Sequence, residues 1–186
     1  MGASRWIPYK RLDLVIEVGA RLDMPVVIAG SGPEEAKLRE LTERIHPNGV
    51  EFHVQPDRDV LRSLMADASA FIFPPHEDFG IIAVEVQATG TPVVGLGAGG
   101  ALDTVRDNET GALAADQRVE SFVEATQRCL GLDDPTERCR HHAEQFSAPN
   151  FRRLVRDWVA ETAAGSTADV SRIVDLGQQE YHKVAA

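Results

Sequence analysis

The sequence predicts an α/β fold in which a Rossmann-like, doubly wound parallel sheet is followed by C-terminal helices. Short apolar runs rich in β-branched residues alternate with segments of helical period, as in parallel sheets covered on both faces. From Arg118 onward only helical periods remain. The 186 residues, 43% hydrophobic and 26% charged, suit one globular domain with an ordinary core.

The expected elements follow one another along the chain in a regular order. Strands are expected over 24–30, 49–54, 70–75, 91–97 and 111–115. Helices are expected over 12–19, 36–45, 60–68, 81–88, 101–108, 118–130, 135–146 and 150–162. Residues 1–164 are expected to form the domain. The polar residues 165–186 are expected to form a tail that is either helical or disordered.

Composition and charge exclude several classes of protein. Nineteen basic residues against twenty-nine acidic ones give a net charge of −10, which opposes binding to nucleic acid or to an anionic membrane. The two cysteines, Cys129 and Cys139, form no disulfide framework and suit a reducing compartment. No apolar run reaches the roughly 18 residues of a membrane span. We therefore expect a cytoplasmic protein with no nucleic-acid partner and no integral membrane segment.

Four loops follow the expected strands at one edge of the sheet. They read "GSGP" (30–33), "VQPDRD" (54–59), "PPHEDFG" (74–80) and "GLGAGG" (95–100). All four are rich in residues that turn the chain, cap helices or expose backbone. Open parallel sheets bind ligands beyond the carboxyl ends of their strands, so these loops predict a binding cleft there.

The loop over 74–80 carries the clearest ligand signal. Gly80 is expected to begin a helix, with Glu77 in the loop and Glu85 about two turns into the helix. The amides of residues 79–81 would then be the open donors of a helix N-terminus, suited to a diphosphate, and the two glutamates could accept hydrogen bonds from sugar hydroxyls. Alternatively Glu77 and Asp78 only cap the helix. Capping leaves unexplained why Glu85 stands on a helix otherwise rich in Ile, Ala and Val.

The glycine-rich loops allow other interpretations. "GLGAGG" at 95–100 satisfies G-x-G-x-x-G after a strand, and Asp116 follows Gly100 by 16 residues, as in an NAD-dependent oxidoreductase. Against this, the loop follows a late strand and the next helix is short. The "GSGP" loop either presents amides to a phosphate or only makes a tight turn. A non-catalytic α/β binding module also stays open.

The acidic residues give no persuasive metal site. Asp57 and Asp59 could hold a divalent cation, but Asp57 fits the N-cap of the following helix and Asp59 suits its dipole. His76 has no second histidine at ligand spacing. We expect no metal site and no cofactor beyond a substrate nucleotide.

Taken together, these residues resemble the nucleotide-binding half of family-4 retaining glycosyltransferases, which have the GT-B architecture. The E-x7-E motif of that family matches Glu77 and Glu85, and its R-x4-K element matches Arg5 and Lys10 in "SRWIPYKRLD". "GAGGALDTVRDNETGAL" resembles its glycine-rich turn and closing strand. "YKRLDLVIE", "EDFGI" and "GGALDTV" look most like the mannosyltransferases of bacterial and archaeal surface-polysaccharide assembly.

The resemblance implies a role for each matching residue. Glu77 would contact hydroxyls of the donor sugar, Glu85 would bind the ribose hydroxyls, and Arg5 and Lys10 would neutralise the diphosphate of the leaving group. The catalytic residues would be Glu77, Lys10 and Arg5, and the donor-binding residues Asp78, Phe79, Gly80, Ile81, Glu85, Gly30, Ser31, Gly32 and Gln55.

The resemblance also implies a function. The chain would be the donor-binding domain of a metal-independent α-mannosyltransferase that uses GDP-mannose, with a UDP-sugar as second choice, in cell-surface polysaccharide or glycolipid synthesis. Val54 and Gln55 stand where the family has a glycine and often a basic residue. Because this loop would contact the base of the nucleotide, the choice between guanine and uracil stays open. A sugar-nucleotide epimerase would use a similar donor half.

The resemblance also implies that another part of such an enzyme binds the acceptor. An N-terminal domain of comparable size would bind the acceptor glycan or glycolipid, so this chain alone would be inactive. Its first residues would lie within the first strand of the donor domain. With a lipid-linked acceptor, the protein would be peripheral to the inner face of the cell membrane.

Overall fold

In the computed structural model, which describes residues 1–163, six parallel strands carry the fold. They are β1 (Gly2–Arg5), β2 (Val26–Ser31), β3 (Val50–Val54), β4 (Phe71–Phe73), β5 (Val93–Leu96) and β6 (Gly111–Ala114). Four of them lie within the strands expected from apolar runs, and β2 matches the expected strand 24–30 but ends one residue later. The sixth, β1, is the opening strand that only the family resemblance implied.

The strands form two ladders that meet at β1 and β4. One ladder has the order β1-β2-β3 and the other β4-β5-β6. Between them, the amide of Ile72 donates to the carbonyl of Met1 at 2.8 Å, and the Met1 amino group donates to the carbonyl of Ala70 at 3.0 Å. The order across the molecule is therefore β3-β2-β1-β4-β5-β6, and the chain reverses its direction of winding between β1 and β4.

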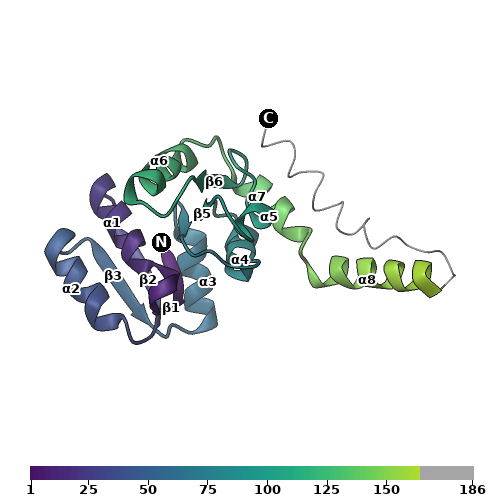
Figure 1. The fold of residues 1–186 in the computed structure, drawn as a ribbon, viewed down its shortest axis with the longest axis horizontal. Helices are drawn as coiled ribbons and strands as arrows, with labels where there is room; N and C mark the ends of the chain where they lie inside the picture. Colours follow the sequence, from purple (N-terminus) through teal and green to yellow (C-terminus); the bar gives the residue numbers. More distant parts are fainter. Residues whose placement is uncertain (164–186) are drawn as a thin grey trace. The chain divides into compact units, whose positions relative to one another are not determined.

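Helices cover both faces of these strands, as a doubly wound fold requires (Figure 1). The first face packs on α1 (Leu12–Leu22), α2 (Glu35–Ile45) and α6 (Val119–Leu130). The second packs on α3 (Arg58–Asp67), α4 (Ile81–Thr89) and the short α5 (Ala101–Thr104). Neighbouring strand residues alternate between the two faces, so Val94 joins the first core and Val93 the second. The α/β fold class is confirmed.

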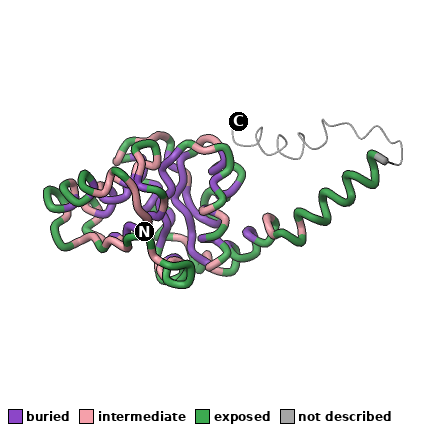
Figure 2. The backbone as a smooth tube through the Cα atoms, turned by 90° about the horizontal axis from the view of Figure 1, so that it is seen from below, coloured by how far each residue is buried: buried purple, intermediate pink, exposed green. Residues whose placement is uncertain are grey.

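Burial is greatest along the strands, as the purple centre of the first unit in Figure 2 shows. Because both faces are covered, β4, β5 and β6 are apolar on both sides, whereas the edge strand β3 alternates Val50, Phe52 and Val54 with Glu51 and His53. α1 approaches β2 closely at Gly19, where a Cβ atom would lie 2.0 Å from the Val26 side chain. Glycine at this position lets α1 pack directly on β2.

Helix α3 begins directly after Asp57, as the capping interpretation predicts. The Asp57 carboxylate accepts hydrogen bonds from the amides of Asp59 at 3.0 Å and Val60 at 2.9 Å. It is therefore the N-cap of α3, and its carboxylate satisfies two of the open amides at that end.

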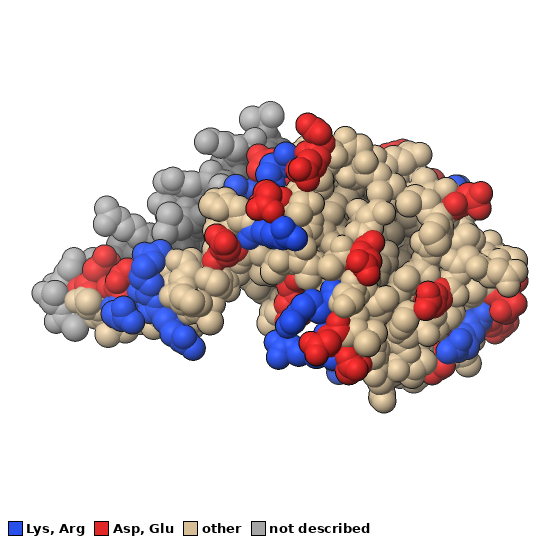
Figure 3. Space-filling view, turned by 180° about the vertical axis from the view of Figure 1, so that it is seen from behind, with Lys and Arg blue, Asp and Glu red and all other residues tan. Residues whose placement is uncertain are grey.

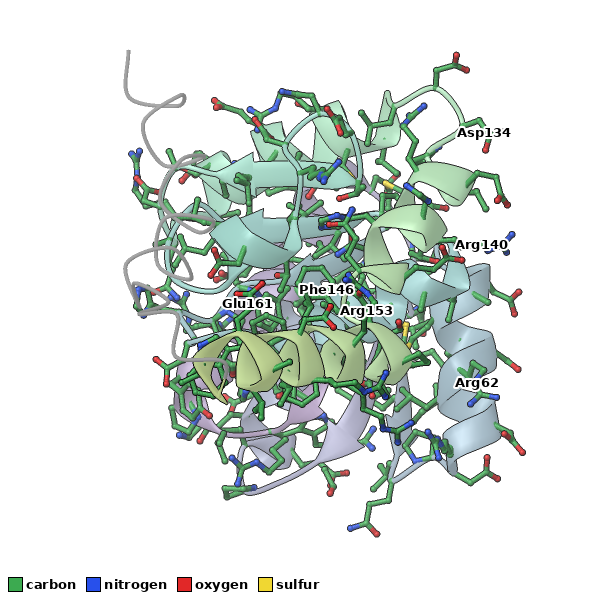
Figure 4. The ribbon with its side chains drawn as sticks, turned by 90° about the vertical axis from the view of Figure 1, so that its right-hand side faces the viewer. Arg62, Asp134, Arg140, Phe146, Arg153 and Glu161 are labelled. Atoms are coloured by element: carbon green, nitrogen blue, oxygen red, sulfur yellow. The ribbon has the colours of Figure 1, made fainter. Side chains whose placement is uncertain are left out.

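The chain divides into two compact units, Met1–Ala143 and Glu144–Ala186. The short helix η1 (Pro8–Lys10) and nearly all of α7 (Thr136–Glu144) belong to the first, and α8 (Ala148–Ala163) belongs to the second. On α8, Phe151, Leu154, Val155, Trp158 and Val159 recur at three- and four-residue spacing and form one apolar face. Figure 4 shows the α8 side chains, with Arg153 and Glu161 labelled. The tail expected over 165–186 lies outside the described residues.

The surface carries charges of both signs. On the face drawn in Figure 3, acidic and basic side chains are interspersed. Among the described helices, none is both long enough and apolar enough to cross a membrane.

Candidate functional site

A cavity of about 670 Å³ opens at the carboxyl edge of the strands, beside the point where β1 and β4 meet. Ser4, Tyr9 and Lys10 line it from the β1 side. The chain after β4 supplies the rest of the lining with residues 76–82 and Glu85. In open α/β sheets this reversal point is where ligands bind. A cavity is therefore present at this edge, but of the four loops expected to form it only the loop over 74–80 contributes to its lining.

Gly80 turns the chain from β4 into α4. Its φ of 82° lies in the left-handed region, and a Cβ atom there would be 2.8 Å from the Phe73 ring, so only glycine fits. Within residues 1–163, no side chain caps this end of α4. The interpretation of Glu77 and Asp78 as mere caps is therefore wrong. The first amides of α4 stand at the cavity wall, where an anion would satisfy them.

Lys10 and Glu77 form an ion pair across the cavity. Their side chains are 13% and 20% exposed, so the pair is partly shielded from water. Lys10 belongs to the R-x4-K element and Glu77 to the E-x7-E motif, and only the meeting of β1 with β4 brings them together. The site thus opposes a cation and a carboxylate beside the open end of a helix.

Glu85 is the fifth residue of α4 and lies in its second turn, at the rim of the cavity. Its carboxylate is exposed, and within the described part of the chain no donor contacts it. The buried side of α4 consists instead of Ala83, Val86 and Gln87. Water therefore satisfies Glu85 in the free protein, and the helix does not bury it as its apolar neighbours had implied. The side chain is available to a ligand.

The glycines of the 95–100 loop support the Glu77 loop from behind. The Gly100 amide donates to the Glu77 carbonyl at 2.7 Å, and a Cβ atom on Gly100 would lie 2.2 Å from the Phe79 backbone. Gly99 has a φ of 61°, and a Cβ atom there would lie 2.5 Å from the same carbonyl. These two glycines let one backbone pack directly on another.

This packing removes the basis of the oxidoreductase interpretation. The Gly97 amide donates to the Ala114 carbonyl at 2.8 Å, and the Ala98 amide to the Leu96 carbonyl at 2.7 Å. The Gly100 amide is also hydrogen-bonded, so few backbone amides of this loop remain that could donate to a pyrophosphate. Asp116 accepts instead from the Ser121 hydroxyl at 2.6 Å and from the Arg118 amide, and these hydrogen bonds lower the pKa of its carboxyl.

Arg5 lies at the carboxyl end of β1 with an exposed side chain, and it does not line the cavity. Gly30 and Gly32 have a packing role. A Cβ atom on Gly30 would lie 1.9 Å from the Ser4 carbonyl oxygen, and one on Gly32 would lie 2.4 Å from that of Trp6. The turn after β2 therefore wraps closely around the start of the chain. It does not reach the cavity.

Gln55 and Ser31 meet beside that turn. The Gln55 side-chain amide donates to the Ser31 hydroxyl at 3.2 Å, and its backbone amide donates to the Gly30 carbonyl at 2.8 Å. The structure thus groups the two residues, at the carboxyl ends of β2 and β3, on the same edge of the sheet as the cavity but outside its lining.

Four cavity residues were absent from the sequence-based set. They are Ser4, Tyr9, His76 and Ile82. Tyr9 directly precedes Lys10 and His76 directly precedes Glu77, so adjacency to a motif residue was an available signal. The ring of His76 lies over Gly99, where a Cβ atom would be 3.3 Å from its Nε2 atom.

Solved structures share this fold. Anabaena HepE in complex with UDP and glucose matches 86% of the chain and 47% of its own length, with a TM-score of 0.72 at 22% identity. A glycosyltransferase from Rickettsia africae matches with a TM-score of 0.74 at 21% identity, covering 86% and 46% of the two chains. Pneumococcal GtfA in complex with UDP and GlcNAc matches with a TM-score of 0.67 at 21% identity, and the match covers 90% of this chain and 35% of GtfA. The fold is one half of the GT-B glycosyltransferase architecture.

The sequence match is more specific. Residues 3–146 match the family described as glycosyl transferases group 1, and the chain belongs to that family. A D-inositol 3-phosphate glycosyltransferase of Jonesia denitrificans is 33% identical over 163 residues, which cover 78% of this chain and 38% of the relative. The Streptomyces griseus enzyme of the same name is 33% identical over 168 residues, covering 86% and 33%. The chain thus spans between a third and two fifths of these relatives.

Proposed function

We propose that the chain is the donor-binding domain of a retaining glycosyltransferase and holds a nucleoside diphosphate sugar in the cavity between β1 and β4. The observation that carries this proposal is the Lys10–Glu77 ion pair beside the uncapped start of α4. A cation and open helix amides suit a diphosphate, and carboxylates suit sugar hydroxyls. One ligand that carries both groups fits this arrangement.

The chemistry would be transfer of the sugar with its α-configuration kept. As the sugar leaves, negative charge grows on the diphosphate, and Lys10 with the first amides of α4 would stabilise it. Arg5, exposed beside them on β1, would add charge from outside the cavity. Glu77 and Asp78 would hold the sugar, and Glu85 the ribose. A metal ion is not needed for this scheme because the protein itself supplies the positive charge.

The donor's identity rests on two indications that differ. The motif likeness favours GDP-mannose and a mannosyltransferase of polysaccharide or glycolipid synthesis. The solved structures of HepE and of pneumococcal GtfA contain UDP, and this supports a UDP-sugar. Ser31 and Gln55, which share a hydrogen bond at the ends of β2 and β3, would border the base. A titration with both nucleotides decides between them.

The acceptor would bind elsewhere. Because the chain spans only 38% and 33% of the two relatives compared, we assign the acceptor glycan or glycolipid to the remaining part of a longer, cytoplasmic protein. Catalysis would then depend on bringing the two parts together around the substrates. The isolated chain is expected to bind nucleotide weakly and to transfer no sugar.

The testing experiment is calorimetric titration of the purified chain with UDP, GDP and NADH, repeated on Glu85→Ala. Loss of hydrogen bonds from ribose hydroxyls to a carboxylate is expected to weaken nucleotide binding about ten- to a hundred-fold. Glu43→Ala is the matched control, since Glu43 is an exposed glutamate on α2 that does not line the cavity.

Each outcome has a clear meaning. Diphosphate nucleotide binding that Glu85→Ala weakens and Glu43→Ala leaves intact supports the proposal. Binding of NADH alone would favour the oxidoreductase. Nucleotide binding that both variants leave unchanged would move the site away from α4.

A further inference from the structure

Tyr9 lines the cavity and lies under the ammonium group of Lys10. The Lys10 Nζ atom is 5.0 Å from the centre of the Tyr9 ring. This falls within the roughly 6 Å at which a cation is attracted to the face of an aromatic ring. Tyr9 is 52% exposed, so its ring is a wall of the cavity rather than part of the core. Lys10 thus has two partners in the cavity, the Glu77 carboxylate and this ring.

Tyr9 and Lys10 stand on one short, hydrogen-bonded turn of the backbone. Tyr9 and Lys10 form η1 together with Pro8, whose ring fixes φ at the first position of that turn. The Lys10 amide donates to the Ile7 carbonyl at 3.0 Å, and the Arg11 amide donates to the Pro8 carbonyl at 3.2 Å. Arg11 then adopts a left-handed φ of 52° and ends the turn. The backbone positions of Tyr9 and Lys10 are therefore fixed locally.

A lysine needs such support when it must serve two anions. Its ammonium stands at the end of a flexible four-carbon stem and carries three donors without directional preference. With Glu77 as its sole partner, it would follow the carboxylate wherever that side chain turned. The ring adds a second, uncharged attraction that does not compete with an incoming phosphate for the positive charge.

We propose that Tyr9 is a positioning residue that keeps the Lys10 ammonium in the cavity, where it can pair with Glu77 and with a diphosphate at once. The inference rests on the proposed function for its ligand. It goes beyond that function because it assigns a role to Tyr9, which occupies a variable position of the R-x4-K element between Arg5 and Lys10. The ring face, rather than the phenol hydroxyl, performs this role.

The first test needs no ligand. The chain has three lysines, Lys10, Lys37 and Lys183, so ¹³C-lysine labelling gives a simple spectrum. A ring under Lys10 shifts the protons of its ε-methylene group upfield of those of Lys37, which pairs with Glu34 at 2.7 Å on an exposed part of α2. Tyr9→Leu is expected to remove this shift and Tyr9→Phe to keep it. An unshifted Lys10, or a shift that survives Tyr9→Leu, overturns the inference.

The second test measures what the ring does for a diphosphate. The ratio of the dissociation constants of UMP and UDP, or of GMP and GDP, reports the added affinity of the second phosphate. Tyr9→Leu is expected to lower this ratio about two- to five-fold, the scale of one exposed cation–π contact, and Tyr9→Phe to preserve it. Equal weakening of mono- and diphosphate binding would instead mean that Tyr9 only contacts the ligand or supports the fold, and would overturn the positioning role.

The two failures are distinguishable. If neither nucleotide binds the unaltered chain, the proposed function fails, while the lysine spectrum still decides whether the ring holds Lys10. If nucleotides bind and Lys10→Met lowers the ratio but Tyr9→Leu does not, the function stands and the role of Tyr9 is refuted.

Discussion

Lys10 and Glu77 are the residues on which the site depends, and each constrains the other. Both are less than a quarter exposed, so removal of one leaves a partly buried charge without its partner. A variant of either residue therefore changes stability as well as binding. For this reason the main tests above act on the exposed neighbours Glu85 and Tyr9, and Lys10→Met serves only as the comparison for Tyr9→Leu.

Gly100 offers a test of how the Glu77 loop is positioned. Gly100→Ala would place a Cβ atom 2.2 Å from the Phe79 backbone, so the loop must move away from the cavity wall. We expect a loss of about 1–3 kcal/mol in the free energy of unfolding, together with weaker nucleotide binding. Urea denaturation and calorimetry measure the two effects.

The control for this variant is Gly131→Ala. A Cβ atom on Gly131 would make only ordinary contacts at 3.5 Å, and its φ of −85° suits alanine. Its stability is expected to stay within about 0.5 kcal/mol of the unaltered chain. Equal effects of the two substitutions would show that Gly100 does not position the loop.

At the scale of the element, α4 and α3 differ in how their first turns are completed. Asp57 caps α3, whereas no side chain within residues 1–163 caps α4. The other side of α4 is tied down by Gln87, whose buried amide donates to the carbonyls of Ala83 at 3.0 Å and Thr104 at 2.6 Å. The helix is therefore anchored through its buried side while its N-terminus stays open to a ligand.

The cap of α3 gives a prediction for an element away from the site. Asp57→Ala removes the acceptor of two amides and is expected to lower the free energy of unfolding by about 1 kcal/mol. Asp59→Ala is the matched control. The interaction of Asp59 with the helix dipole stabilises the fold by at most about 1 kcal/mol, and its ion pair with Arg62 is long, at 3.9 Å. Thermal or urea unfolding compares them. A larger loss for Asp59→Ala would contradict the assigned cap.

At the scale of the whole molecule, the two thiols report on the integrity of the first unit. Cys129 lies on α6 and Cys139 on α7, and both side chains are buried. Burial raises the pKa of Cys129 to about 12 and that of Cys139 to about 11. Because only the thiolate reacts, both residues are protected twice, by protonation and by packing.

We therefore expect alkylation with iodoacetamide at pH 8 to be very slow in the folded chain. A rise of two to three units in pKa lowers the thiolate fraction on the order of a hundred- to a thousand-fold. In concentrated urea both thiols should react within minutes at the rate of a free cysteine. Mass spectrometry counts the labels over time. Rapid labelling of the folded chain at either cysteine would contradict its burial.

Much of this molecule could be predicted from local sequence patterns. The apolar runs marked five strands, and the helical periods marked the helices between them, since periodicity expresses which faces a segment buries. Gly80 as the start of α4 and Asp57 as the cap of α3 followed from rules that act within a few residues. Glu77 and Glu85 are eight residues apart in the sequence, so their places before and within α4 followed from the same local rules.

Only the tertiary structure decided which distant residues meet. The polar opening run Gly2–Arg5 has no strand pattern of its own, and it is a strand because β2 and β4 flank it. That placement brings Lys10 to Glu77, lets Tyr9 face the cavity and leaves Arg5 outside it. It also turns the 95–100 glycines from a suspected nucleotide loop into the support of another loop. Sequence patterns record local conformation and burial, whereas these pairings depend on strand order, which arises when the whole core packs.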